Sequence, residues 1–337
     1  MIRSTLIREA RGARFNVRGF HQAPNTIHYS LSTAFLSLLL VVFFESIVLK
    51  YEERRRATVI EMKIVYGIAE DIGFRPSMED AHAIWEIEEE DVFSAEVYDG
   101  HAGSTAAHLA AEMLTPEFLS LLRAERTKSL DGRRGDRELL REAYLATDAY
   151  ILTRATDNSG TAAATLHVFG DRFLAANAGD TRVVMGTAQG AMQLTLDHKP
   201  HLSDERSRIE ALGGRVVFYD VPRVQGVLAM SRALGDLSLK PYVSAEPRVV
   251  EGLLAPENDF AIVACDGVWD VLKPGDVISM VRDVGEVTRA AERVVAEALA
   301  SGSTDNVTVI VLDLRQHTAE LARKKMEILA VLDHAGE

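Results

Sequence analysis

The stretch DVFSAEVYDGHAG, residues 91–103, carries the clearest structural signal in the chain. Its apolar and aromatic residues predict a strand over 91–98, and Asp99-Gly100 follows at once. A second apolar run, DFAIVAC at 259–265, ends in the same way with Asp266-Gly267. One Asp-Gly pair after a strand is usually only a turn. Two such pairs indicate that the strand ends carry function.

Outward from this stretch, expected strands adjoin other strands and expected helices come in pairs. Further strands are expected at 63–69, 161–169, 172–177, 182–187 and 306–313. Helices are expected at 104–123, 136–154, 203–212, 274–283 and 286–300, with an exposed polar loop at 124–136. Because strict strand–helix alternation is missing, the order favours an α+β fold with antiparallel sheets over a doubly wound fold.

Composition limits the classes of function. The chain has 337 residues, 47% of them hydrophobic, which suits a folded protein with a sizeable core. A net charge of −13 argues against a general nucleic-acid binder. A single cysteine, Cys265, excludes an internal disulfide and a thiolate zinc cluster, and its apolar surroundings indicate a core residue.

The first sixty or so residues differ from the rest. Residues 1–56 hold nine Lys or Arg against four acids, whereas the remainder holds twenty-eight against forty-six. Arginines at 3, 8, 11, 14 and 18 resemble those of an organelle transit peptide. Residues 31–49 form an apolar run long enough to span a bilayer, with Glu45 near one end.

We therefore expect residues 1–62 to form a basic targeting or membrane-anchor segment. A membrane anchor, a cleaved mitochondrial or chloroplast targeting segment and translation from Met62 remain open alternatives. Without such a segment the protein would lie in the cytoplasm or nucleus. Basic residues on both sides of the apolar run give no orientation. Residues 316–337 predict a short helical tail with Leu321, Ile328 and Leu329 partly buried.

Acids occupy the boundaries of several strands. Asp99, Asp180 and Asp266 follow strands, Asp305 opens another, and Glu79-Asp80 open the strand after Ser77-Met78. Converging strand ends can hold carboxylates within a few ångströms, where they repel one another unless cations neutralise them. Carboxylate oxygens suit Mg²⁺ or Mn²⁺ rather than zinc or copper.

Eight motifs extend this pattern in chain order. They are RPSMED (75–80), VYDGHAG (97–103), SGTA (159–162), ANAGDTR (176–182), LTLDHKP (194–200), SRALGD (231–236), ACDGVWD (264–270) and DNVT (305–308). In this order and spacing they resemble the metal-dependent PP2C-type protein phosphatases over residues 63–315. The resemblance implies a central antiparallel β-sandwich flanked by helix pairs. It also implies a monomeric enzyme that dephosphorylates serine and threonine in phosphoproteins.

The resemblance also implies roles for individual residues. Asp99 would bridge two Mg²⁺ or Mn²⁺ ions, with the Gly100 carbonyl on one and Asp266 and Asp305 on the other. Glu79 and Asp80 would hold metal-bound waters, and Asp180 would complete a third, weaker site with Asp266. Arg75 would bind the substrate phosphate through its guanidinium fork. His101 would protonate the leaving oxygen while water between the metals attacks.

Two alternatives stay open beside this interpretation. The chain could be an inactive regulatory protein that keeps the fold, or a two-metal hydrolase of small phosphate esters or nucleic acid, although the acidic charge argues against nucleic acid. Ala102 departs from the commoner Asp-Gly-His-Gly-Gly pattern of the family without removing a ligand. For Arg232, in the SRALGD motif, an ion-pair or packing role is favoured over substrate contact.

Overall fold

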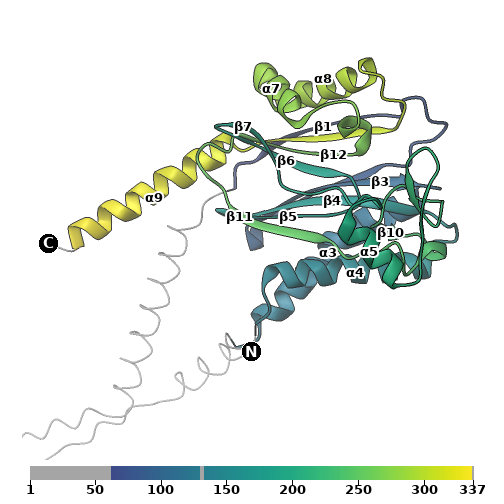
Figure 1. Ribbon diagram of the computed structural model, residues 1–337. Helices are drawn as coiled ribbons and strands as arrows, with labels where there is room; N and C mark the ends of the chain where they lie inside the picture. The colour runs from purple at the N-terminus through teal and green to yellow at the C-terminus, as the bar shows by residue number, and fades with distance from the viewer. Residues whose placement is uncertain (1–61, 130–132, 336–337) are drawn as a thin grey trace, which may run out of the picture. The chain divides into compact units, whose positions relative to one another are not determined.

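The computed structural model describes residues 62–129 and 133–335. Two antiparallel sheets pack face to face, and helices cover the outer face of each (Figure 1). The first sheet runs β1 (Val65–Asp71), β13 (Val307–Asp313), β12 (Phe260–Ala264), β6 (Arg182–Thr187), β7 (Gly190–Gln193). The second runs β11 (Arg248–Leu253), β5 (Arg172–Ala178), β4 (Gly160–Phe169), β3 (Val92–His101), β2 (Ala81–Ile87), with β10 (Leu234–Gly235) paired to β4.

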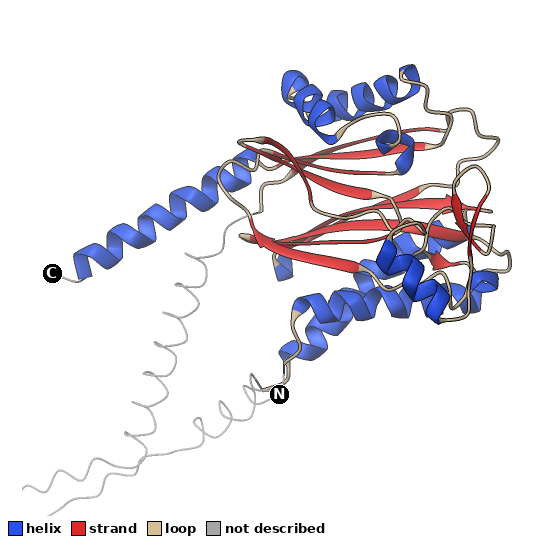
Figure 2. Cartoon of the chain, in the orientation of Figure 1, coloured by secondary structure: helices blue, strands red, loops and turns tan. Residues whose placement is uncertain are grey.

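Helices form the two outer layers (Figure 2). On the second sheet lie α3 (Thr105–Arg126) and α4 (Asp136–Arg154), and on the first lie α7 (Pro274–Val284) and α8 (Val287–Ala300). The remaining elements are η1 (Glu88–Glu90), α5 (Ser203–Ala211), the hairpin β8 (Val216–Phe218) and β9 (Pro222–Val224), η3 (Leu237–Leu239), α6 (Asp266–Trp269) and α9 (Arg315–Ala335). The predicted α+β fold with antiparallel sheets and helix pairs is confirmed.

Strand β3 shows why the chain forms two cores around this sheet. Phe93, Ala95 and Val97 face the core between the sheets, whereas Val92 and Tyr98 face the core under α3 and α4. Successive side chains of a strand point to opposite faces, so a run that is apolar at nearly every position is buried on both. The same alternation places the side chains of Asp99 and His101 on the face that meets the first sheet, at the end of the strand.

Most expected elements lie within a few residues of their predicted bounds. Helix α3 runs to Arg126, which shortens the expected polar loop at 124–136. The short strands β7, β8, β9 and β10 and the exposed strand β11 were not predicted, because short runs give little periodic signal.

The C-terminal tail is one helix of 21 residues, α9. Leu321 packs against the core between the sheets, as predicted. Ile328 and Leu329 are 52% and 46% exposed, so the prediction that they are partly buried was wrong.

The basic segment predicted at 1–62 lies outside the described residues except for Met62, and so does the apolar run 31–49. Within the described ranges, the helices include none with the length and apolar character needed to cross a bilayer.

Candidate metal centre

Strand ends from both sheets bring four of the six predicted acids together, whereas Glu79 and Asp305 belong to neither group of neighbouring ligand atoms. Asp99 lies at the end of β3, Asp180 follows β5, and Asp266 begins α6 directly after β12. Carboxylate oxygens of these three residues lie within 4.8 Å of one another. A second group joins Asp99 to Asp80 and the Cys265 sulfur within the same limit. Asp99 therefore belongs to both groups.

Burial and neighbouring charge raise the pKa values of Asp99, Asp266 and Asp80. Burial is the largest cause for Asp99, whose pKa lies well above its usual range, and the charges of Asp266, Asp80 and Asp180 add to it. Burial and the charge of Asp180 act in the same way on Asp266. For Asp80 burial raises the pKa to about 6. Such a cluster holds protons or cations, because bare neighbouring charges repel one another.

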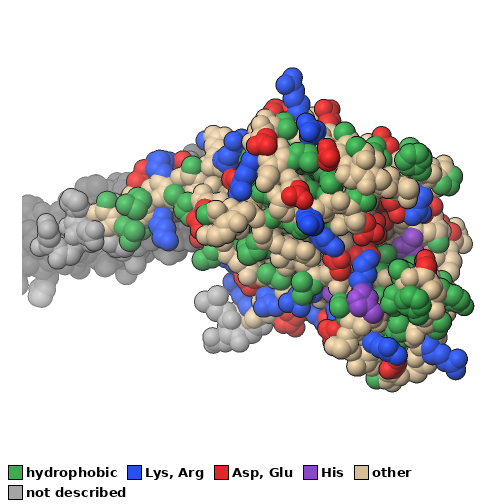
Figure 3. Space-filling view, turned by 45° about the horizontal axis from the view of Figure 1, so that its top comes forward, with side chains coloured by type: hydrophobic (Ala, Val, Ile, Leu, Met, Phe, Trp, Pro, Cys, Tyr) green, Lys and Arg blue, Asp and Glu red, His purple; other side chains and the backbone are tan. Residues whose placement is uncertain are grey.

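The donor set suits a hard divalent cation. Asp180 Oδ1 is buried without a hydrogen-bond partner, and Asp180 Oδ2 lies 2.5 Å from Lys199 Nζ. Burial raises the pKa of the Cys265 thiol well above its usual range, so this residue stays a protonated core cysteine. Carboxylate oxygens without a thiolate match Mg²⁺ or Mn²⁺. On the face shown in Figure 3, acidic side chains gather next to histidine and basic side chains.

Gly100 fits a close approach between two strand ends. A Cβ atom at this position would lie 2.1 Å from the Glu79 carbonyl oxygen, so only glycine allows β3 and the residues before β2 to meet. Asp80, directly before β2, accepts a hydrogen bond at 2.7 Å from Thr308 of β13 in the other sheet. Glu79 lies beside the cluster but belongs to neither group of ligand atoms.

Arg75 and Asp305 stand together at the edge of the cluster. Arg75 Nη2 donates to Asp305 Oδ2 at 2.5 Å, and the Arg75 side chain is 52% exposed. Asn306 holds the loop that carries Arg75, because its amide group donates to the Ile72 and Ser77 carbonyls and accepts from Glu79 N. The guanidinium is therefore placed beside a carboxylate of the site and open to solvent.

His101 lies two residues beyond Asp99 on the same face of β3. Its Nε2 atom lies 2.9 Å from both carboxylate oxygens of Asp236, whereas Nδ1 is buried without a hydrogen-bond partner. The ring is 21% exposed.

Three residues of the site were missed in the sequence. Lys199, Asn306 and Asp236 stand in the motifs LTLDHKP, DNVT and SRALGD, but no pattern assigned them partners. Arg232 of the last motif pairs with Glu205, so the favoured ion-pair role is confirmed.

Known proteins resemble the chain over this region. A family model described as Protein phosphatase 2C matches residues 64–307. Probable protein phosphatase 2C 71 of Arabidopsis thaliana is 39% identical over 261 residues, covering 74% of this chain and 55% of that protein. Probable protein phosphatase 2C 59 of Oryza sativa subsp. japonica is 38% identical over 255 residues, covering 74% of this chain and 76% of that protein.

A solved structure shares the fold. Serine-threonine phosphatase 2C from Toxoplasma gondii superposes with a TM-score of 0.66 at 22% sequence identity. The match covers 76% of this chain and 96% of that one. The chain thus spans only about half the length of the Arabidopsis protein, but nearly all of the solved domain.

Proposed function

The chain belongs to the protein phosphatase 2C family, and from this premise we propose that it hydrolyses phosphoserine and phosphothreonine in proteins with the help of Mg²⁺ or Mn²⁺. One observation carries the proposal. Carboxylate oxygens of Asp99, Asp180 and Asp266 converge within 4.8 Å from three separate chain segments. Their mutual repulsion favours divalent cations at this point.

The carboxylates of this chain would hold two ions. Asp99 would bridge them, with the Gly100 carbonyl, Asp266 and Asp305 as further ligands. Glu79 and Asp80 would act through water, and Asp180 would serve a third, weaker position. When bound, the ions supply a water acidic enough to attack phosphorus near neutral pH and neutralise the charge that develops there.

Arg75 and His101 would act on the substrate itself. The exposed Arg75 guanidinium offers two parallel N–H donors to phosphate oxygens. As the oxygen of water bonds to phosphorus, the bond from phosphorus to the serine or threonine oxygen breaks. His101 would give that leaving oxygen its proton, so that the products are the free hydroxyl and inorganic phosphate. No covalent enzyme intermediate is needed.

A direct experiment compares substrates and metals on the full chain. Phosphate release from a phosphoserine peptide should require Mn²⁺ or Mg²⁺, stop with EDTA and exceed release from nucleotides. The inactive regulatory protein is not favoured, because every carboxylate that the resemblance requires is present. Absence of turnover with Mn²⁺ would nevertheless establish it, and preference for nucleotides would establish a small-ester hydrolase.

For residues 1–62 we propose a targeting or anchoring role, supported by their basic arginines and apolar run. A fluorescent fusion of this segment would be imaged in two forms, one translated from Met1 and one translated from Met62. The form that starts at Met1 should move to an organelle or a membrane. Diffuse fluorescence from both forms would refute the role.

A further inference from the structure

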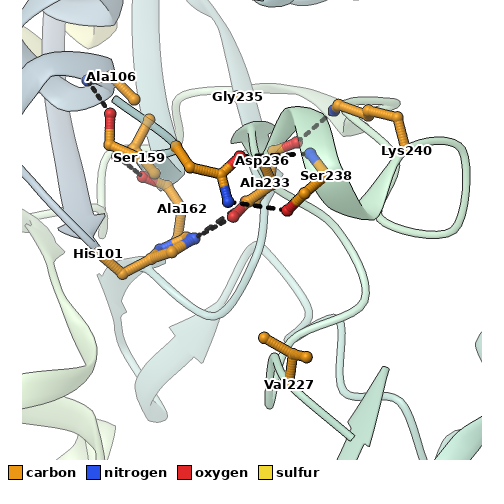
Figure 4. Close-up of polar contacts among 12 residues, drawn as sticks. His101, Ala106, Ser159, Ala162, Val227, Ala233, Gly235, Asp236, Ser238 and Lys240 are labelled. Atoms are coloured by element: carbon orange, nitrogen blue, oxygen red, sulfur yellow. Dashed lines mark hydrogen bonds and ion pairs between the residues drawn. The ribbon is translucent and has the colours of Figure 1, made fainter. Parts of the chain in front are cut away.

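His101 and Asp236 approach each other across strand β4, from the end of β3 and from the residue after β10. His101 of β3 pairs with Gly160 of β4, and Gly160 pairs in turn with Gly235 of β10. Asp236 is the next residue after Gly235. Three adjacent strands therefore bring the two side chains together from positions 135 residues apart in sequence (Figure 4).

Gly160 leaves the space in which they meet. A Cβ atom on this glycine would lie 2.1 Å from Asp236 Oδ2 and 2.5 Å from His101 Nε2. Real Cβ atoms do not approach other atoms so closely. The missing side chain in the middle strand thus allows the carboxylate to reach across β4 to the ring.

The backbone of Asp236 is held in a conformation that L-residues rarely adopt. Its φ and ψ are 53° and 46°, a left-handed region in which Cβ crowds the backbone carbonyl. Neighbouring contacts hold it there: Asp236 N donates to the Ser159 carbonyl, and Gly235 N donates to Asp148 at 2.7 Å. Strain of this kind gathers at functional sites.

The Asp236 carboxylate depends on His101. Its side chain is 5% exposed, and burying a carboxylate is costly without a partner. The nearby cation Lys240 is engaged by Asp148 at 3.0 Å. Within the described ranges, the one side chain that forms an ion pair or hydrogen bond with this carboxylate is the ring of His101.

We infer that Asp236 is the positioning residue of His101. Its two oxygens accept the Nε2–H, which sets the tautomer and the plane of the ring on the face of β3 that carries Asp99. In this role Asp236 acts through the ring and not on the substrate. It acts by keeping the ring beside the cluster. When both ring nitrogens carry a proton, Nε2–H stays on Asp236 and the Nδ1 proton is the one that passes to the leaving oxygen.

The inference rests on the proposed acid role of His101, and the test keeps the two apart. Asp236→Gly removes the carboxylate and suits the left-handed backbone, and Asp236→Asn keeps an oxygen that accepts from Nε2–H. Asp91 has nearly the same backbone, φ 56° and ψ 48°, but lies before the opposite end of β3. Asp91→Gly and Asp91→Asn are therefore matched controls for the backbone change.

Two esters report on the acid. Phenyl phosphate has a poor leaving group and 4-nitrophenyl phosphate a good one that needs little protonation. With Mn²⁺, Asp236→Gly should lower kcat for phenyl phosphate by about 10- to 100-fold and for the nitrophenyl ester by less than about threefold, with KM unchanged. Asp236→Asn should recover most of the rate, and Asp236→Gly should add little to His101→Ala.

Other results of these measurements would overturn either the positioning role of Asp236 or the acid role of His101. If His101→Ala slows only phenyl phosphate but Asp236→Gly does not, Asp236 is not the positioning residue. A higher kcat in Asp236→Gly would mean that the carboxylate restrains the histidine instead. Equal slowing of both esters by His101→Ala would refute the acid role. In that case ¹⁵N spectra of the His101 ring in the metal-free chain still test the contact between His101 and Asp236. The contact requires the neutral ring to be the Nε2–H tautomer in wild type and to lose this preference in Asp236→Gly.

Discussion

Replacing Asp80 by asparagine should make the metal-free protein more stable above pH 6. Asp80 is 5% exposed, and burial raises its pKa from 3.8 to about 6 although Thr308 donates a hydrogen bond to it. The folded state therefore holds this proton more tightly than the unfolded state. The stability that the proton contributes is complete below about pH 4 and is lost as the pH rises through about 6.

The shift of about two units corresponds to about 3 kcal/mol. Asparagine carries no charge and its amide oxygen still accepts from Thr308. The difference in unfolding free energy between Asp80→Asn and wild type should thus grow from near zero at pH 4 to about 3 kcal/mol at pH 8. Urea unfolding in EDTA measures it at both pH values, with exposed Asp283→Asn as the control.

Addition of Mn²⁺ should narrow the difference in unfolding free energy between Asp80→Asn and wild type at pH 8. A ligand that binds only the folded state at one hundred times its dissociation constant adds about 2.7 kcal/mol to wild type. Asp80→Asn should gain less, because a carboxylate of the site is gone. An Asp80→Asn protein that is less stable than wild type at pH 8 in EDTA, or a difference that is the same at both pH values, would refute the effect assigned to the buried Asp80 carboxylate.

Three further substitutions test other parts of the account. Glu96 is fully buried, and burial raises its pKa from 4.5 to about 7, so wild-type stability should fall by about 3 kcal/mol as the pH rises from about 4.5 through 7. In urea unfolding, the unfolding free energy of Glu96→Gln should not fall with pH in this way. A pH profile identical to that of wild type would contradict the prediction. Ala102 has a left-handed φ of 56°, so Ala102→Gly should raise the unfolding free energy by up to about 1 kcal/mol, whereas a loss of stability would show that the backbone is not strained. Arg75→Lys loses the two-pronged guanidinium, so KM for a phosphopeptide should rise about tenfold while thermal stability stays unchanged; an unaltered KM would remove Arg75 from substrate binding.

The long elements could be predicted because their patterns are local. The apolar run of β3 and the apolar run of β12 shortly before Asp266 are visible in any short window. The convergence of Asp99, Asp180 and Asp266 was inferred from their shared position at strand ends, and the structure brings their oxygens together. The position of each acid at the end of a strand can be read from the sequence, and no knowledge of how the strands pair is needed to expect that they converge.

The contact between His101 and Asp236 could not be predicted in this way. It depends on the register of three strands, on the two-residue strand β10 and on the missing side chain of Gly160. Residue spacing contains no register, and β10 is too short to show a period. Likewise, Ala102 looked like a harmless departure from a glycine pattern until its φ of 56° gave the physical reason for glycine there.

The most direct test of the metal centre removes its shared ligand. Phosphate release from a phosphoserine peptide by the full chain would be measured in EDTA, with Mn²⁺ restored, and in Asp99→Ala with the same Mn²⁺. Because Asp99 belongs to both groups of ligand atoms, we predict activity only for wild type with Mn²⁺ and a loss of at least about 10³-fold in Asp99→Ala. Turnover that persists in EDTA, or in Asp99→Ala, would contradict the account.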